Sequence, residues 1–565
     1  MTVHFAQLAP LAVIVPFLGA ALSLVLLRRH GLQRVVAIGS LVISLAVETT
    51  VLISTWDQGP QVVHLGNWEA PWGIVMVVDQ LSSLMLVVST VVSLAVLVYA
   101  TGQGVADGDE EGPISIFHPS FLILVAGVSN AFLAGDLFNL YVGFEILLTA
   151  SYVLMTMGGT AQRIRTGVTY VVVSVISSVL FLITIAMIYA ATGTINMADL
   201  HGKLGELPVG TQMQLHLMLL IAFGIKAAVF PLSFWLPDSY PTASAPVTAV
   251  FAGLLTKVGV YAMVRTETLL FPGDSLNTPL MVAALLTMVV GILGALAQSD
   301  IKRLLSFTLV SHIGYMVFGL AMSSVAGLGA AVFYVAHHIT IQTSLFLVTG
   351  LIERRGGSSS VDRLGGLAKL SPLLAILFFI PGMNLAGIPP FSGFLGKVGL
   401  MQAGVELGTP LAYALVIGGV LTSLLTLLAI ARVWNRAFWR RPSDAEHPDP
   451  VLLSVPEEAD RAEDAVQRAG SRTGIMLAAR TGVQRLAGAS PRAGASRPAT
   501  LLPRTMVGST LGLVALGVAL TVFAGPLFGL SDRAAADMLD RSPYIQAVMG
   551  EDTVVPAVST RGGGQ

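Results

Sequence analysis

Three lysines of this chain lie inside long apolar runs, where a charged side chain is costly. Lys226, Lys257 and Lys397 are half of the chain's six lysines, and the other 25 of its 31 basic residues are arginines. Arginine stays protonated, whereas a buried lysine can lose its proton near neutral pH. The use of lysine at these places therefore indicates groups that titrate. For Lys397, which lies near the end of its run, snorkelling to the membrane surface is the alternative.

Glu145 is the acidic counterpart of these lysines. It lies mid-run, with no other charge between Asp136 and Arg163. An isolated charge at the centre of a bilayer costs about 2.5–3.5 kcal/mol on insertion scales. Pairing lowers this cost but seldom makes a buried charge stabilising. A purely structural role is thus the weaker explanation for Glu145 and Lys226.

Histidines occur in two neighbouring apolar runs. His312 lies in one run, and His337 and His338 lie in the next. A single histidine in a helix is most often a satisfied polar residue, but two such runs beside three lysines favour a proton relay, because imidazole titrates near pH 6.5. His337 and His338 point about 100° apart on a helix, so one of them is expected to face the path. No cluster has metal-ligand spacing, and no metal site is expected.

The composition is that of an integral membrane protein. Of 565 residues, 54% are hydrophobic and 11% charged, against about 25% charged in soluble domains. There is no cysteine, which excludes disulfides, cysteine-ligated iron–sulfur clusters and thiolate zinc sites within this chain. Neither a basic cluster with interleaved aromatics nor a GxxxxGK phosphate loop occurs, so no nucleic acid, ATP or other cofactor is expected.

The elements that must hold the charged residues are transmembrane helices. One span takes about 20 apolar residues. The first run lacks the positive flank of a signal peptide and is predicted to be a retained helix. This length predicts an all-α fold with about 14 spans, at 8–28, 34–55, 79–101, 119–135, 137–157, 167–191, 214–235, 243–264, 279–298, 301–322, 327–351, 372–400, 411–434 and 505–530.

The placement of basic residues predicts the orientation of these spans. Most of them fall in alternate connections and in the arginine-rich stretch 432–504, which the positive-inside bias assigns to the cytoplasm, with both termini outside. The inner connection at 102–118 contributes none. Residues 440–504 are rich in Pro, Ser, Ala and Arg and are predicted to be a partly disordered cytoplasmic linker, with a possible surface helix at 457–488.

Prolines interrupt two of the predicted spans. "VFPLSFWLP" (229–237) contains Pro231 and Pro237, and "GIPPFSGFLGK" (387–397) contains Pro389 and Pro390. Two interrupted segments in comparable positions of two halves are a sequence pointer to the ion site of a transporter. The carbonyls freed by each break must line protein or a watery cavity, because lipid cannot satisfy them.

Three motifs together resemble one superfamily. "FGIKAAVFPLSFWLPDSYPTASAPVTAVFAGLLTKVGVYAMVR", "SDIKRLLSFTLVSHIGYM" and "GIPPFSGFLGKVGL" resemble the antiporter-like subunits shared by Mrp-type cation/proton antiporters and respiratory complex I, over about 70–435. The ending "AADMLDRSPYIQAVMGED" further resembles the tail of the D-type Mrp subunits. The resemblance implies fourteen helices with two inverted five-helix repeats, each with one broken helix. The implied division is 1–118 (N-terminal helices), 119–265 and 279–434 (repeats), 440–504 (linker) and 505–565 (last helix and external tail).

The resemblance also implies roles for the singled-out residues. Glu145 is expected to pair with Lys226, Lys257 to bridge the halves, and Lys397 to be the terminal site, with the relay continued by His312 and His338. Secondary candidates are Asp136, Asp238, His337 and Gln342. Many relatives carry a lysine close to the position of Gln342, so a relay step there is expected to be absent or water-mediated. The linker is longer than the family leads us to expect.

The function that the resemblance implies is a proton-translocating subunit of a multi-subunit Na⁺/H⁺ antiporter, a secondary transporter rather than an enzyme. Its expected partners are other Mrp subunits, H⁺ and Na⁺, in a bacterial cell membrane. Two alternatives stay open: a subunit of a redox-driven pump, in complex I or a membrane-bound hydrogenase, and a scaffold whose buried charges only fix helix register. The "SPYIQAVMG" tail and the lack of a long lateral helix after the last span favour the Mrp type over a redox-driven pump.

Overall fold

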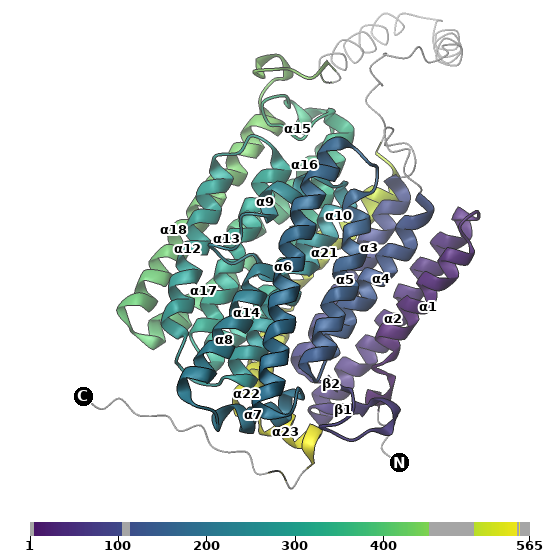
Figure 1. Cartoon of the computed structure of the whole chain (residues 1–565). Coiled ribbons are helices and arrows are strands. Elements are labelled where there is room, and N and C mark those ends of the chain that lie inside the picture. Colours follow the sequence, from purple (N-terminus) through teal and green to yellow (C-terminus); the bar gives the residue numbers. More distant parts are fainter. Residues whose placement is uncertain (1–4, 104–113, 451, 453–501, 551–552, 554–565) are drawn as a thin grey trace, which may run out of the picture.

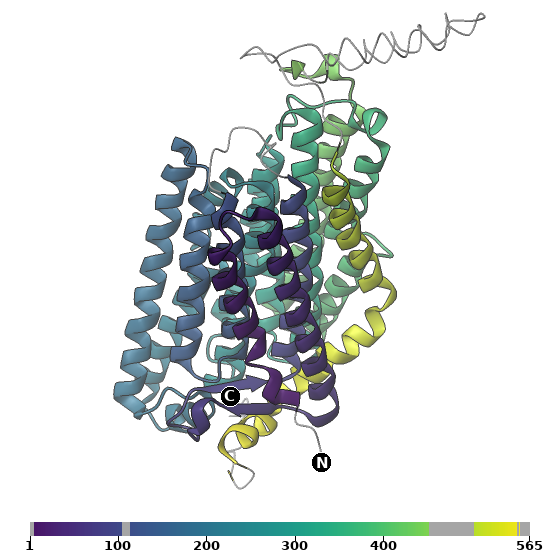
Figure 2. The ribbon, with the colours of Figure 1, turned by 90° about the vertical axis from the view of Figure 1, so that its right-hand side faces the viewer.

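The computed structural model describes residues 5–103, 114–450, 452, 502–550 and 553. Its helices run side by side in one bundle (Figures 1 and 2). We call the end of the bundle that carries β1, β2, α7 and α23 the hairpin face, and the end that carries α15 and 440–450 the linker face. The surface helix predicted at 457–488 and most of the linker lie outside the described residues.

Four groups of elements build the chain in order. The N-terminal group is η1 (Phe5–Leu8), α1 (Leu11–Val25), α2 (His30–Gln58), β1 (Gln61–His64), η2 (Leu65–Asn67), β2 (Val75–Val78) and α3 (Gln80–Gln103). The next is α4 (Ile114–Leu133), α5 (Leu137–Thr156), α6 (Ala161–Thr192), α7 (Met197–Gly205), α8 (Val209–Ala227), α9 (Leu236–Ser239), η4 (Tyr240–Thr242), α10 (Ala245–Val250), η5 (Phe251–Leu255), α11 (Thr256–Arg265) and η6 (Thr266–Leu270).

The third group is α12 (Asn277–Leu296), α13 (Ile301–Ala321), α14 (Val325–Gly356), α15 (Leu367–Leu370), α16 (Pro372–Ala386), α17 (Ser392–Leu407), α18 (Pro410–Val433), η7 (Trp434–Trp439) and η8 (Pro442–Asp444). The last is α21 (Arg504–Val522), α22 (Ala524–Asp540) and α23 (Ser542–Met549). The strands β1 and β2 pair antiparallel, with Gln61 opposite Val78 and Val63 opposite Met76.

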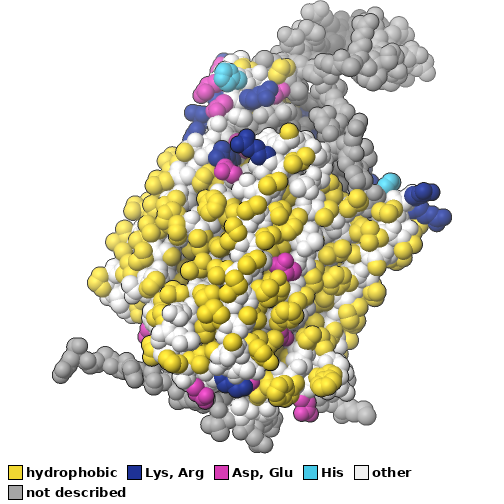
Figure 3. Space-filling model, viewed as in Figure 1, with side chains coloured by type: hydrophobic (Ala, Val, Ile, Leu, Met, Phe, Trp, Pro, Cys, Tyr) yellow, Lys and Arg dark blue, Asp and Glu magenta, His cyan; other side chains and the backbone are white. Residues whose placement is uncertain are grey.

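Twelve helices of the described residues are long and apolar enough to cross a membrane. They coincide with twelve of the predicted spans, and the two remaining predictions, 214–235 and 372–400, fall on the interrupted helices. The all-α membrane class is therefore confirmed, while the count of fourteen and the bounds of the repeats stay predictions. Figure 3 shows hydrophobic side chains over the middle of the bundle and most charged ones toward its two ends.

The first interruption lies between α8 and α9. α8 ends at Ala227, and Ala228 takes the left-handed conformation with φ 60°. Pro231 has no N–H to continue a helix, and Pro237 stands in the first turn of α9, where a missing N–H costs nothing. The indole N–H of Trp235 donates to the carbonyl of Ile225, in the last turn of α8, at 3.1 Å.

The second interruption lies between α16 and α17. α16 ends at Ala386, and Gly387 has φ 82°, a conformation that glycine adopts without a Cβ penalty. Pro389 and Pro390 follow, and α17 starts at Ser392. Each predicted broken helix is thus broken where its prolines lie.

The interior of the bundle is built around α14 and the segment from α10 to η6. In both of these spans all residues of the apolar 18-residue stretch are buried inside the protein. In α6 and in the span Pro410–Trp439, which includes α18, only 39% of that stretch is buried. α14 contacts α3, α10, α13, α16, α17, α21 and α22. Polar side chains on α14 therefore face protein on every side.

Candidate functional site

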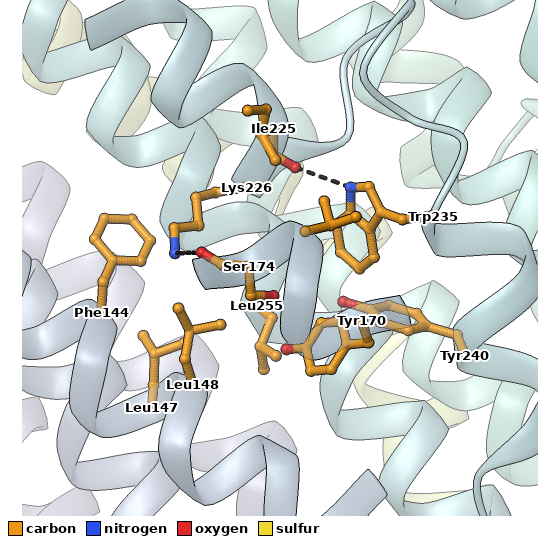
Figure 4. Close-up of a pocket in the computed structure, with 11 residues that line it drawn as sticks. Phe144, Leu147, Leu148, Tyr170, Ser174, Ile225, Lys226, Trp235, Tyr240 and Leu255 are labelled. Carbon is orange, nitrogen blue, oxygen red and sulfur yellow. Dashed lines mark hydrogen bonds between the residues drawn. The ribbon is translucent and has the colours of Figure 1, made fainter. Parts of the chain in front are cut away.

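Lys226 lies one residue before the end of α8, beside the first break. Its side chain is 7% exposed, and Nζ donates to Ser178 Oγ at 2.7 Å and to the Ser174 carbonyl at 3.3 Å, both on α6. Nζ also lies 5.5 Å from the centroid of the Phe144 ring on α5. Figure 4 shows the ammonium end directed at Ser174 and facing Phe144. The lysine is held by uncharged oxygens and a ring face.

Glu145 is not joined to Lys226 by an ion pair. It follows Phe144 on α5, is half-buried, and its Oε1 has no hydrogen-bond partner among the described residues. Phe144, its neighbour on α5, places its ring 5.5 Å from Lys226 Nζ. The structure therefore brings α5 to the lysine without the direct Glu145–Lys226 contact that the sequence led us to expect.

A narrow cavity joins Lys226 to the first break. It encloses about 20 Å³, room for about one water, and its lining includes Lys226, Tyr170, Trp235 and Tyr240. Figure 4 shows Trp235 and Tyr240 entering it from the broken segment. A second cavity, of about 650 Å³, lies next to it and is lined by Pro237, Asp238 and Ser239 of the same segment, together with α6 residues and Arg303.

Lys257 is fully enclosed near the start of α11. It is 0% exposed, and its Nζ donates to the carbonyl of Ala252, 2.5 Å away, in the π-helical turn η5. A Cβ at Gly259 would lie 2.6 Å from the Ala227 nitrogen, so this glycine lets α11 lie directly against the end of α8. Lys257 is thereby held on an element that touches the backbone of the first break.

A ring cluster surrounds His312. Its Nδ1 and the hydroxyl of Tyr334 are 2.6 Å apart, and its ring centroid is 5.1 Å from that of His338. His312 Nε2 and both ring nitrogens of His338 have no hydrogen-bond partner among the described residues, although both residues are 0% exposed.

Lys397 lies at the second break. Its Nζ donates to the carbonyls of Leu385 and Ala386, each at 3.1 Å, which are carbonyls freed at the end of α16. It also lies 4.9 Å from the centroid of the Tyr315 ring. The side chain is 2% exposed, so the alternative of snorkelling to the surface does not describe it.

The secondary candidates lie in different surroundings. His337 Nδ1 is 2.9 Å from Ser392 Oγ, which ties α14 to the second break. Gln342 donates to the Leu305 carbonyl at 2.7 Å, and its Oε1 has no partner among the described residues. Asp238 is exposed and pairs with Arg303 at 2.7 Å. It belongs to the wall of the 650 Å³ cavity.

Asp136 lies at the hairpin face, where it caps α5. Its Oδ1 accepts from the Asn139 N–H at 2.7 Å, while Oδ2 has no partner among the described residues. Burial raises the pKa of Asp136 to about 6, against backbone hydrogen bonds that lower it. The geometry does not bring Asp136 to any of the three lysines.

Sequence reasoning missed two tyrosines and one carboxylate. Tyr334 stands four residues before His338 and Tyr315 three residues after His312, so helical spacing alone would have placed each beside a histidine. Glu48 of α2 is 0% exposed in a transmembrane helix. The signal that singled out Glu145, a lone carboxylate in an apolar run, applies equally to Glu48.

The three buried lysines share one kind of surroundings. Lys226, Lys257 and Lys397 are buried on oxygens or ring faces without a carboxylate partner, and His312 and His338 keep ring nitrogens without a partner among the described residues. Such groups exchange charge for neutrality at small cost, because no ion pair has to be broken. Among the described residues, no group of three or more His, Asp or Glu is placed to hold a metal ion.

Comparison with known proteins identifies one family. Residues 134–426 match the family described as NADH:quinone oxidoreductase/Mrp antiporter, TM. The D subunit of the Na⁺/H⁺ antiporter of Alkalihalophilus pseudofirmus is 37% identical over 96% of this chain and 100% of the relative.

Two solved structures share the fold. One chain in the structure of the Mrp complex from Dietzia sp. superposes with a TM-score of 0.83 at 33% identity, over 97% of this chain and 100% of that one. One chain of the membrane-bound sulfane sulfur reductase, an archaeal respiratory complex, superposes with a TM-score of 0.78 at 23% identity, over 96% and 100%. At that identity the second likeness concerns the fold alone.

Proposed function

The chain belongs to the NADH:quinone oxidoreductase/Mrp antiporter family, and on this premise we propose that it is the D-type subunit of a multi-subunit monovalent cation/proton antiporter in a bacterial membrane. It is a transporter subunit rather than an enzyme. Its partners are the other subunits of such a complex, and its substrates are H⁺ and a monovalent cation. The membrane is the bacterial cell membrane, with both termini outside.

Protons move along Glu145, Lys226, Lys257, His312, His338 and Lys397. The observation that carries this proposal is the state of the lysines: each is buried, and each ammonium group rests on hydroxyl or carbonyl oxygens or a ring, not on a carboxylate. A structural lysine in a bilayer would be paired, because an unpaired charge there is expensive. Lysines that must alternate between charged and neutral are better held in this way.

Protons enter from the linker face through the first break. Within this break, Trp235 and Tyr240 line the 20 Å³ cavity at Lys226, and Pro237, Asp238 and Ser239 line the 650 Å³ cavity. Between them, Ser239 Oγ and Tyr240 OH are buried and have no partner among the described residues. Hydroxyls that can rotate and hold water are suited to hand a proton inward from one cavity to the other.

Glu145 is the point at which another subunit acts. It is only half-buried on α5, beside exposed apolar residues such as Phe138. A carboxylate at this depth cannot remain against lipid at small cost, so a partner subunit covers it. Movement of Glu145 toward or away from Lys226 then changes which form of the lysine is stable. One proton moving down 100 mV releases about 2.3 kcal/mol, which the complex uses to expel the cation.

The proposal is tested by replacing lysines in the whole complex, with flux measured in vesicles. Lys226→Ala and Lys397→Ala should assemble normally and lose proton-coupled cation flux, whereas Lys203→Ala should keep it, since Lys203 is half-exposed on α7. Lys226→Arg should also fail, because arginine keeps its proton. Full flux in Lys226→Arg would contradict a titrating role, and loss of assembly in the alanine variants would favour a scaffold.

The redox-driven pump is the second candidate, and it shares the fold. The end of the chain disfavours it: α22 and α23 are 17 and 8 residues long, and α23 returns to contact α7 and β1. No long lateral helix follows α21 among the described residues. Na⁺-dependent proton movement by the complex without any electron donor separates the two candidates.

A further inference from the structure

Glu48 is a buried carboxylate that the proton line does not use. It lies on α2, outside both predicted repeats, and is 0% exposed. Ten residues separate it from Gln58 at the hairpin face and eighteen from His30, which corresponds to depths of about 15 Å and about 27 Å along a helix. Figure 2 shows α1 and α2 (purple) at the edge of the bundle that faces the viewer. Glu48 therefore belongs to a separate place in the membrane.

No cationic side chain neutralises Glu48. Its Oε1 accepts from Thr90 Oγ1 at 3.0 Å, and its Oε2 has no partner among the described residues. The elements packed against α2 are η1, α1, α3 and α4, and their titratable residues are Tyr99 and His118. Tyr99 is nine residues from Thr90 along α3, and His118 lies near Arg34 and His30 at the other end of α2. The charge of this carboxylate, when present, is thus unmatched by the described residues.

One hydroxyl, that of Thr90, contacts Glu48, and further buried hydroxyls lie within about one turn along α2 and α3. Two hydrogen bonds set the register of the antiparallel helices α2 and α3: Thr55 with Ser83 at 3.1 Å and Thr90 with Glu48 at 3.0 Å, seven residues further along each helix. In this register Ser93 lies level with Ser44, one turn from Glu48, and Ser89 adjoins Thr90. The hydroxyls of Ser44, Ser89 and Ser93 are all buried without a hydrogen-bond partner among the described residues.

A second polar level lies between α2 and α3 nearer the hairpin face, with buried apolar residues such as Val51 and Leu86 between it and Glu48. At this level Thr55 and Ser83 bond to each other, and Gln61 at the start of β1 donates to Ser54 at 2.8 Å. Gln80, the first residue of α3, is 1% exposed and has neither amide atom partnered among the described residues. Between Ser44 and the linker face, the described residues show no further hydrogen bond between a polar side chain of α2 and one of α3.

A carboxylate near hydroxyl oxygens, with no nitrogen donor, offers only oxygen ligands, which hard cations prefer. Its single negative charge matches one monovalent cation. We propose that Glu48, Thr90 and the flanking serines of α2 and α3 bind one Na⁺ from the hairpin face, in competition with a proton on the same carboxylate. Either ion makes the site neutral, whereas a divalent ion would leave a net charge in the membrane. The inference deepens the proposed function, because it rests on that function for the identity of the cation.

The direct test is infrared difference spectroscopy of the purified complex with and without Na⁺. In the parent complex, Na⁺ should remove the carbonyl stretch of a protonated carboxyl group, since the two ions exclude each other. Glu48→Gln should abolish this difference, and Glu69→Gln should leave it unchanged, because Glu69 is an exposed carboxylate between the strands. A difference spectrum that is the same in Glu48→Gln, or a Glu48 carboxyl band that Na⁺ does not alter, overturns the proposal.

Transport gives a second readout with a closely matched pair. Thr90→Val removes the hydroxyl that contacts Glu48, and we expect the Na⁺ concentration for half-maximal antiport to rise by about threefold to tenfold, as for one lost polar contact. Thr49→Val is the control, since Thr49 adjoins Glu48 in sequence but is exposed and bonds only to the Leu45 carbonyl. Equal Na⁺ dependence in Thr90→Val and Thr49→Val overturns the site.

Two further variants keep the test independent of assembly and of the proton line. Should Glu48→Gln not assemble, Glu48→Asp keeps the charge and should assemble with weakened Na⁺ dependence; a parent-like dependence counts against the site. Lys226→Ala should keep the Na⁺-induced infrared difference while losing flux. If Lys226→Ala keeps flux, the proposed proton line fails while the Glu48 site stands, so the two failures are told apart.

Discussion

At the scale of single residues, the three lysines of the proposed proton line are held without ion pairs. Lys226 rests on two oxygens of α6, Lys397 on two carbonyls of α16, and Lys257 on a carbonyl of its own helix. Each of these contacts stabilises the ammonium form through an uncharged oxygen. If the lysine lost its proton, no carboxylate would be left without its partner, because none contacts these lysines. The rings of His312 and His338, in contrast, have nitrogens without a hydrogen-bond partner among the described residues.

Tyr334 is the residue that orients this ring cluster. Its hydroxyl contacts His312 Nδ1 at 2.6 Å, which sets the ring orientation and leaves Nε2 available. Tyr334→Phe should assemble normally and lower proton flux by about a hundredfold, the lower end of what a positioned proton donor contributes. Flux in vesicles is the measurement, and Tyr413→Phe on exposed α18 is the control. Unchanged flux in Tyr334→Phe would remove the tyrosine from the path.

At the scale of elements, backbone carbonyls at the two helix breaks receive hydrogen bonds from different side chains. In the first, the indole of Trp235 donates to a carbonyl in the last turn of α8, and Lys226 donates to α6. In the second, Lys397 itself satisfies the carbonyls of α16. Both solutions meet the requirement that backbone groups inside a membrane find partners in the protein. The second break therefore couples the charge on a lysine to the state of the helix end.

Gly387 gives a way to test that coupling. Gly387 and Gly408 both have positive φ, 82° and 68°, at the two ends of the segment that includes α17. Alanine at either position should cost about 1–2 kcal/mol of stability. A Cβ at Gly387 would meet Lys397 Cδ at 2.9 Å, whereas at Gly408 the nearest atom is 3.9 Å away.

We therefore expect Gly387→Ala and Gly408→Ala to lower the melting temperature of the complex alike, and only Gly387→Ala to impair flux. Thermal denaturation and vesicle flux are measured on both variants. Equal flux in the two would mean that the position of Lys397 at the break does not matter for transport.

At the scale of the whole molecule, one buried ion pair ties three parts of the chain together. Arg265 at the end of α11 pairs with Asp79, which precedes α3, at 2.5 Å, and both side chains are less than a tenth exposed. The guanidinium also lies 5.3 Å from the ring centroid of Tyr544 on α23. The pair thus links the N-terminal helices, the first predicted repeat and the end of the chain at the hairpin face.

Removing one partner of this pair should be severe. Arg265→Ala or Asp79→Asn leaves a buried charge unpaired and should cost about 3–5 kcal/mol. The double variant Asp79→Leu with Arg265→Met should cost less than the sum of the single changes. Arg303→Ala is the matched control, because the Arg303–Asp238 pair is 46% and 63% exposed and such pairs contribute about 0–1 kcal/mol. Thermal unfolding of the complex measures all four, and similar small losses throughout would contradict the linking role.

The sequence by itself determined the membrane class, twelve of the predicted spans, the position of both breaks and the identity of the buried lysines. These follow from local chemistry: apolar length, the missing N–H of proline, and the cost of a charge in hydrocarbon. Lys226, Lys257 and Lys397 could be singled out because a lysine in an apolar run is unusual wherever the run ends up in the bundle.

Only the tertiary structure decided what each charged group touches. Glu145 and Lys226 were expected to be in contact, yet α5 and α6 pack so that Ser174 and Ser178 reach the ammonium group first. The hydroxyl of Tyr334 at His312 and the unmatched carboxylate of Glu48 likewise depend on neighbours far away in the chain. The physical reason is that contacts between helices are set by the rotation and register of two packed surfaces, which no single run of sequence contains.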